Sequence, residues 1–380
     1  MSYRPDAATD DGFARRTALF YAAYFVFAGL HLPFLPVWLE ARGLDAAEIG
    51  VVLAAGMAAR PLVVPVATRL ADRRGWLKGP LVAATWATAA SMLLLQASHG
   101  FVPILAANAL ASLAFALILP FADAFALRGL TARGRAYGPV RLWGSVTFIV
   151  ANVGGGLLLE RLGAGNIVWA LTAAMLATAL AASLLRPLGA TSAVAAPATA
   201  GGSLWGSRSF VAVVAIGSVV QSSHAVLYGF ASLQWAARGL DGLQIGALWG
   251  IGVVAEIGLF AVSGRLAGRL RPIDMLALGA GGALLRWGVM AFDPPTALLP
   301  ALQCLHALSF GATHLGAMQF LAAERRGATA QGDYASVVAV VFTAAMGAAG
   351  LLVEAFGSLA YLAMAASAMI GTVIAVAARR

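Results

Sequence analysis

The stretch Ala41-Arg42-Gly43-Leu44-Asp45 recurs 196 residues later as Ala237-Arg238-Gly239-Leu240-Asp241. The same offset relates two further pairs of segments, Ile49-Gly50 with Ile245-Gly246 and Arg69-Leu70-Ala71 with Arg265-Leu266-Ala267. Self-similarity at a fixed period indicates a repeated structural unit. Because the offset holds without a gap and is close to half the chain length, the sequence predicts two similar halves.

The composition places both halves in a membrane. Of the 380 residues, 61% are hydrophobic and 11% are charged, and the mean hydropathy is +0.85. A soluble domain carries roughly a quarter charged residues, so a chain this apolar is expected to bury its surface in lipid. The single Cys304 excludes an intramolecular disulfide. The first apolar stretch, 17–39, is too long for a cleavable signal and has no cleavage site behind it, so we expect it to remain as the first helix.

Helix lengths follow from the thickness of the bilayer. A hydrocarbon core of about 30 Å needs roughly 20 apolar residues per helix. On this basis the sequence predicts an all-α membrane protein with twelve transmembrane helices, at 17–39, 47–70, 79–98, 101–127, 138–159, 166–185, 209–235, 243–267, 273–292, 296–322, 334–353 and 358–378. The Pro/Gly/Ser-rich composition of 187–208 predicts a flexible linker. The expected parts are therefore an N-terminal tail (1–16), an N-terminal six-helix bundle (17–186), the cytoplasmic linker (187–208) and a C-terminal six-helix bundle (209–380).

The net charge of +9 is distributed as in a membrane protein, not as in a nucleic-acid-binding one. With the N-terminus placed in the cytoplasm, 20 of the 25 Lys and Arg residues fall in the tails and loops of that side and 3 on the other side. Cytoplasmic loops of membrane proteins carry this excess of basic residues. We therefore expect a bacterial-type inner (plasma) membrane protein with both termini in the cytoplasm.

Two further observations lead to a family. The repeat copies are six spans apart and so share one membrane orientation, which is the parallel-repeat arrangement of many secondary transporters. The segment Arg69-Leu70-Ala71-Asp72-Arg73-Arg74-Gly75 resembles the signature loop of the major facilitator superfamily. The resemblance implies that Asp72 and Arg73 take part in conformational gating, by locking the cytoplasmic face of the outward-facing state. The second copy of the loop lacks the acidic residue.

A narrower resemblance extends over most of the chain. Four segments are similar to the 3-phenylpropionate transporter group, which lies near the lactose-permease and nucleoside-symporter branch: 137–145, 223–230, 252–256 and 285–288. The resemblance implies import of a small, aromatic organic acid together with a proton. Arg141, within the first segment, is a candidate for gating or for the cavity wall, with a positive-inside anchor as the alternative.

Four ionisable residues lie inside predicted spans, where a charge costs at least a few kcal/mol unless it is paired or hydrated. Arg60 and Glu256 occupy equivalent positions of the two copies, and Asp123 and Arg286 complete the set. Glu256 is the predicted proton carrier, with Asp123 as a second proton-coupling candidate, and Arg60 or Arg286 is the predicted anchor for a carboxylate. The alternative is that Glu256 pairs with Arg286, and Arg60 with Asp123, as structural ion pairs.

The remaining candidates are polar or aromatic. His224 is a candidate proton relay, with a hydrogen-bonded interior histidine as the alternative; His31, His306 and His314 are expected to be interior histidines of that ordinary kind. Substrate contacts are predicted for Tyr24, Trp143, Phe230, Trp249 and Trp287. Trp143 also fits an interfacial aromatic belt.

We therefore predict a proton-coupled symporter that works by alternating access as a monomer. Its partners are the small organic substrate, the proton and the lipid bilayer, with no nucleic acid. The proton is the coupling ion, and no cofactor or metal site is expected, because no metal-ligand cluster occurs and no glycine run is followed by the Gly-Lys-Ser/Thr of a phosphate loop. A sugar or nucleoside symporter, a drug exporter, an integral-membrane enzyme and a receptor or assembly factor are the alternatives.

Overall fold

A computed structural model describes residues 12–188, 204–267, 269–324 and 327–379, and within these ranges every regular element is helical. The first half contains α1 (Phe13–Ala41), α2 (Ala46–Ala58), α3 (Arg60–Arg74), α4 (Lys78–Ala97), α5 (Phe101–Thr131), α6 (Tyr137–Leu162) and α7 (Ile167–Ser183). The second half contains α8 (Arg208–Ser222), α9 (Ala225–Ala237), α10 (Gly242–Ala267), α11 (Pro272–Met290), α12 (Leu299–Cys304), α13 (Thr313–Ala323), α14 (Gly327–Phe356) and α15 (Tyr361–Ala378).

These helices form twelve passes, as predicted. In the described residues, ten stretches are long and apolar enough to cross a membrane. One of them, Ala330–Ala378, is 49 residues long and contains both α14 and α15, so it makes two passes. The further pass is the segment 299–323, in which a π-helical stretch, Ala307–Ala312, joins α12 to α13. The predicted spans match these elements to within a few residues at most boundaries.

Three passes are interrupted near their middle. The second pass breaks between α2 and α3, where Pro61 follows Arg60, because proline has no N–H to donate and its ring clashes with the preceding turn. The seventh breaks between α8 and α9 at Ser223 and His224. The tenth contains the π-helical stretch, a feature that is frequent at functional sites. The interruptions place Arg60, His224 and His306 in the interior of the bundle.

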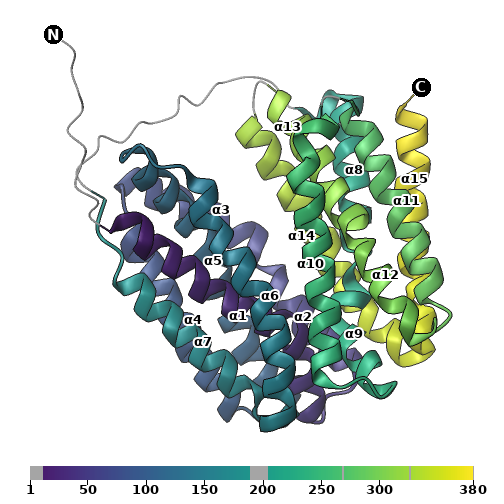
Figure 1. Cartoon of the computed structure of the whole chain (residues 1–380), viewed down its shortest axis with the longest axis horizontal. Coiled ribbons are helices and arrows are strands. Elements are labelled where there is room, and N and C mark those ends of the chain that lie inside the picture. The colour runs from purple at the N-terminus through teal and green to yellow at the C-terminus, as the bar shows by residue number, and fades with distance from the viewer. Residues whose placement is uncertain (1–11, 189–203, 268, 325–326, 380) are drawn as a thin grey trace.

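The two halves form two separate bodies of helices in Figure 1, coloured purple to teal and green to yellow. They diverge toward the end where α1 begins and α15 ends, and they meet at the opposite end. The helices that meet are α6 with α10 and α2 with α14. Each of these pairs joins one half to the other and forms one of two related seams; α1 also contacts α9 across the halves.

Glycine residues allow the helix backbones to approach closely at both seams. A Cβ atom added to Gly156 would collide with the backbone of Gly242, and one added to Gly50 would lie 2.8 Å from the Cα of Gly350. Small residues of this kind let membrane helices approach closely. The seams close one end of the molecule and leave the interior accessible from the other end.

Each seam also carries a carboxylate that binds the first turn of a helix in the opposite half. The Leu243 N–H donates to the Glu160 carboxylate at 3.3 Å, and the Ala47 N–H donates to the Glu354 carboxylate at 3.1 Å. Leu243 and Ala47 occupy equivalent positions of the repeat, 196 residues apart. Free N–H groups and the helix dipole both favour an anion at a helix N-terminus.

The chain-end and linker predictions are only partly within the described structure. Helix α1 already begins at Phe13, inside the predicted tail, because Phe13 stacks on Phe125 with ring centroids 5.4 Å apart. Residues 1–11 of the tail and 189–203 of the linker lie outside the described residues.

Candidate functional site

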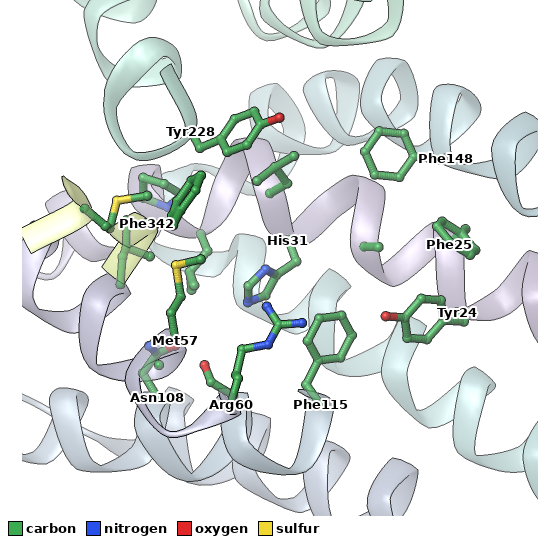
Figure 2. Close-up of a pocket in the computed structure, with 18 residues that line it drawn as sticks. Tyr24, Phe25, His31, Met57, Arg60, Asn108, Phe115, Phe148, Tyr228 and Phe342 are labelled. Carbon is green, nitrogen blue, oxygen red and sulfur yellow. The ribbon is translucent and has the colours of Figure 1, made fainter. Parts of the chain in front are cut away.

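A cavity of about 350 Å³ lies between the two halves. Its wall is built mainly from α1, α2, α5 and α6 of the first half, with Tyr228 from α9 and Phe342 from α14 of the second. Among the described lining residues, Arg60 carries the single formal charge, and no Asp or Glu is present. Figure 2 shows the Arg60 guanidinium inside the cavity, close to His31 and Phe115. The cavity is therefore an apolar chamber with one cation.

Arg60 keeps this charge unpaired. Within the described residues, no hydrogen bond or ion pair involves its guanidinium. Asp123, the structural partner considered from the sequence, instead accepts hydrogen bonds from the hydroxyls of Tyr21 at 2.6 Å and Tyr137 at 2.8 Å. The structural pairing of Arg60 with Asp123 is therefore absent, and Asp123 does not line the cavity.

Aromatic rings form much of the cavity wall. Tyr24, a predicted substrate contact, stacks on Phe115 with centroids 5.4 Å apart. On the opposite wall, Tyr228 stacks on Phe342 at 6.0 Å. Ring faces of this kind bind apolar and aromatic groups through offset or edge-on contacts. Phe25 and Phe148 extend the wall beyond Tyr24 (Figure 2).

A second cleft of about 290 Å³ continues from the first. The two share Met57, Arg60 and Phe342, so Arg60 lies where they meet. The second cleft includes Tyr334, near the beginning of α14, on the side where the halves diverge. Arg60 is thus reachable along a path from the open end of the molecule.

A separate polar cluster lies inside the second half. The Arg286 side chain is fully buried and donates to the Gln303 Oε1 at 2.6 Å and to the Ser309 Oγ at 3.3 Å. Its Nη1 lies 3.2 Å from the Nδ1 of His306, and the other ring nitrogen of His306 lies 3.7 Å from a Glu256 carboxylate oxygen. His306 therefore stands between Arg286 and Glu256, and these two do not form the direct ion pair considered from the sequence.

His306 is the main residue that the sequence interpretation undervalued. It lies on the tenth pass in the spacing Gln303, His306, Ser309, which puts a polar residue on one helical face every three positions. This spacing of polar residues was the sequence feature that could have identified His306 as part of a polar cluster. His224 joins the same cluster, with its Nε2 3.0 Å from the Ser309 Oγ, as a hydrogen-bonded interior histidine.

One aromatic ring separates the cluster from the cavity. Tyr228 lines the cavity, and its ring centroid lies 5.6 Å from that of His224 and 6.4 Å from that of His306. The cavity and the polar cluster are therefore adjacent, although Glu256 and Arg286 are not among the described lining residues of the cavity.

The structure places four of the predicted substrate-contact aromatics away from the two clefts. Phe230 is buried in the core. Trp249 is buried and donates to the Ser232 Oγ at 2.9 Å, and Trp287 is buried, donates to the Ser223 Oγ at 2.8 Å and lies beneath the Arg286 guanidinium. Trp143 is 57% exposed on α6 and lines neither cleft, so it has the position of a lipid-facing residue.

Of the predicted gating residues, the structure describes the side chain of Arg141 but not those of Asp72 and Arg73. The Arg141 guanidinium lies 4.1 Å from the ring centroid of Phe25 and 5.5 Å from that of Tyr21, which are cation–π distances. The backbones of Asp72 and Arg73 belong to α3, but their side chains lie outside the described residues.

Two six-helix halves, meeting at one end of a membrane-spanning bundle and enclosing a central cavity with one cation, define a secondary transporter rather than an enzyme. The sequence profile of the MFS_1 like family matches residues 15–365. The chain belongs to this family of major facilitator transporters.

Curated relatives are transporters of similar length. The chain is 32% identical over 365 residues to a probable 3-phenylpropionic acid transporter of Escherichia coli (strain K12), covering 91% of each protein. It is 31% identical over 341 residues to a maltose permease of Geobacillus stearothermophilus, covering 85% of this chain and 84% of that protein.

Solved structures show the same fold at low sequence identity. The nucleoside transporter NupG matches with a TM-score of 0.81 and 16% identity, covering 96% of this chain and 98% of that one. A bacterial homologue of the human lysosomal transporter Spinster, in an inward-facing and occupied conformation, matches with a TM-score of 0.76 and 14% identity, covering 98% of each.

Proposed function

We propose that this transporter is a proton-coupled symporter that imports a small aromatic carboxylate such as 3-phenylpropionate. The observation that carries the proposal is the Arg60 guanidinium, which has no hydrogen bond or ion pair among the described residues, in an aromatic cavity whose described lining contains no acidic residue. A charge inside a membrane is costly unless it is paired or hydrated. Arg60 is exposed within the cavity, so a ligand that enters the cavity can supply the anion. The curated relative named for 3-phenylpropionic acid supports the same substrate class.

The cavity fits an aromatic acid in shape and chemistry. A guanidinium binds a carboxylate through two parallel N–H···O bonds, which fixes the position of the anion. The rings of Phe115, Tyr228 and Phe342 offer faces against which the apolar part of the substrate packs. A volume of about 350 Å³ is within the usual range for small-molecule sites.

Proton coupling is assigned to the cluster of Glu256, His306 and Arg286. A carboxyl group and an imidazole are the side chains that exchange protons under physiological conditions when their surroundings are partly dry. His306 contacts both other members, so a proton gained or lost at Glu256 changes the charge balance around Arg286. Tyr228 transmits that change to the cavity, because its ring packs against His306 on one side and lines the cavity on the other. We assign no cofactor beyond the coupling proton.

The basic residues assign the membrane orientation. With both termini in the cytoplasm of a bacterial-type inner membrane, the end at which the halves diverge faces the cytoplasm, and the structure represents an inward-facing state. Rocking of the halves about the cavity then exposes Arg60 to either side. The cavity is enclosed by one chain, which supports the proposal that the protein acts as a monomer.

Uptake of radiolabelled 3-phenylpropionate into proteoliposomes, with and without an imposed inward proton gradient, tests the proposal. We expect accumulation that requires the gradient and that Glu256→Gln abolishes, while Glu40→Gln, at an exposed carboxyl at the end of α1, serves as the matched control. Accumulation of the label by Glu256→Gln against its concentration gradient would contradict the assignment of the proton carrier. No uptake by the wild type under either condition would contradict the substrate class.

A sugar or nucleoside symporter is the second candidate, because the maltose permease and NupG are among the similar proteins. Sugar and ribose hydroxyls need many hydrogen-bond partners, whereas the polar groups of this cavity are few: Arg60, His31, Asn108, Ser112 and the hydroxyls of Tyr24 and Tyr228. Competition of uptake by maltose or uridine would favour this candidate. Counterflow in vesicles of known orientation separates import from drug export.

A further inference from the structure

His31 is held in a fixed orientation on the cavity wall. Its ring stacks on Phe115 with centroids 5.7 Å apart and lies 5.2 Å from Phe27, and these two rings lie 5.1 Å from each other, so both aromatic side chains pack on the same side of the imidazole. These contacts leave the two ring nitrogens, at the edge of the ring, available for hydrogen bonds. Figure 2 shows this edge turned toward the Arg60 guanidinium across the cavity. Stacking therefore orients the imidazole without using its hydrogen-bonding groups.

Neither polar group has a partner of its own. Within the described residues, no hydrogen bond involves a ring nitrogen of His31 or the guanidinium of Arg60, and both line the cavity. Arg60 is exposed and His31 is partly exposed, so a ligand that enters the cavity can reach both groups. A neutral imidazole carries one N–H donor and the guanidinium carries several. The two side chains thus present donors to one space. Acceptor oxygens such as that of Asn108 also line the cavity, but among the described residues none of them is hydrogen-bonded to His31 or Arg60.

We propose that His31 and Arg60 together form the carboxylate-binding site, in which Arg60 supplies the charge and the His31 N–H donates a second, orienting hydrogen bond. The inference rests on the proposed function, because it assigns an anionic end to the substrate. It adds a substrate-binding residue on α1 and a basis for selectivity: His31 discriminates a carboxylate from a neutral group of the same shape.

The same geometry orients the rest of the substrate. From His31, α1 continues through Leu32 and Leu35 toward the closed end, and Leu53 and Met346 complete that part of the wall. With the carboxylate at His31 and Arg60, the apolar group extends into this closed part. No second cation lies there among the described lining residues, so the site selects monocarboxylates with an apolar tail and rejects dicarboxylates of similar length.

Binding to the full-length protein in lipid nanodiscs tests the assignment, with 3-phenylpropionate and its neutral analogue 3-phenylpropionamide as the probes. His31→Phe keeps the ring that Phe115 and Phe27 cover but removes the donor, and His31→Gln restores an N–H. The matched control is His99→Phe, at an exposed histidine that contacts Arg42 outside the cavity. Thermal unfolding of each variant verifies that it is folded.

We expect His31→Phe to lower the preference for the acid over the amide by about tenfold, the size of one charge-assisted hydrogen bond. His31→Gln restores part of the preference, and His99→Phe leaves it unchanged. A His31→Phe protein that binds the acid and the amide with the wild-type ratio overturns the role of His31 and leaves the proposed function standing. A wild-type protein that shows no preference for the acid overturns the proposed function itself.

Discussion

Equivalent positions in the two halves carry opposite charges and have opposite surroundings. Arg60 of the first half lies in the cavity with no acidic neighbour among the described residues, whereas Glu256 of the second half lies beside His306 and outside the cavity lining. The helices differ too. The second pass breaks at Arg60-Pro61, and the eighth pass, α10, continues unbroken through Glu256 because Ile257 stands where the first half has proline. We propose that the duplicated backbone has diverged into a half that offers an anion site and a half that offers a proton site.

The largest effect is expected at Arg60. We expect Arg60→Ala to weaken binding of 3-phenylpropionate by about a hundredfold or more, because two hydrogen bonds to a charged group are lost together. Arg60→Lys keeps the charge but not the two-pronged geometry, and its binding should be intermediate. Calorimetric titration in detergent measures both. Equal affinity of Arg60→Ala and the wild type would show that the first half does not provide the anion site.

The second half is tested at His306. We expect His306→Phe to lower the steady-state accumulation of substrate by about tenfold or more, because the contact between Glu256 and Arg286 through the imidazole is removed. Counterflow, which needs no net proton movement, should stay within a factor of about two of the wild type. If counterflow fell as far as accumulation, His306 would belong to substrate binding, and the division of roles between the halves would be wrong.

The seams between the halves give a third test. In Gly246→Leu the added side chain would meet the backbone of Asn152 in the opposite half. We expect this variant to populate the state in which that end is open and to lose most of its transport, because overpacking between close backbones costs about 1–3 kcal/mol or more. Gly258→Leu is the control, because an added Cβ at this glycine of the same helix has no other atom within 4 Å. Distances between spin labels placed on α6 and α10 report the opening.

The smallest effect is expected at the two carboxylates that bind helix N-termini across the seams. Glu160→Gln and Glu354→Gln each remove a charge from the first turn of α10 or α2. We expect each to shift the conformational equilibrium by about twofold to fivefold toward the open seam, and the double variant to shift it further. The same spin labels measure the shift. A shift in only one single variant would show that the two seams are not equivalent.

Much of the fold was predictable because it depends on patterns along the chain. The apolar spans, the offset repeat and the loop at Asp72 predicted twelve passes in two halves, and the structure and the family match confirm this architecture. The site was less predictable. Charged residues are rare inside membrane spans, and this rarity identified Arg60 and Glu256 as candidates. The same criterion could not distinguish Arg286, which is buried among polar partners, from Arg60, which faces the cavity.

Aromatic residues and histidines were the least predictable class. Trp249 and Trp287 looked like candidate substrate contacts, yet each donates its indole N–H to a serine inside the second half. His31 and His306 looked like ordinary interior histidines, yet one faces Arg60 across the cavity and the other joins Arg286 to Glu256. The sequence around a histidine does not show whether its ring nitrogens face a helix backbone or a cavity.

The sequence by itself determined what local chemistry and spacing control: membrane insertion, the number of passes, the duplication and the scarcity of intramembrane charge. Only the tertiary structure decided which polar groups meet. Partners such as His306 and Glu256, or Tyr228 and Phe342, are brought together by packing between helices that are distant in sequence. Hydrogen bonding and charge pairing depend on distances of a few ångströms. Those distances arise only once the helices have packed against one another.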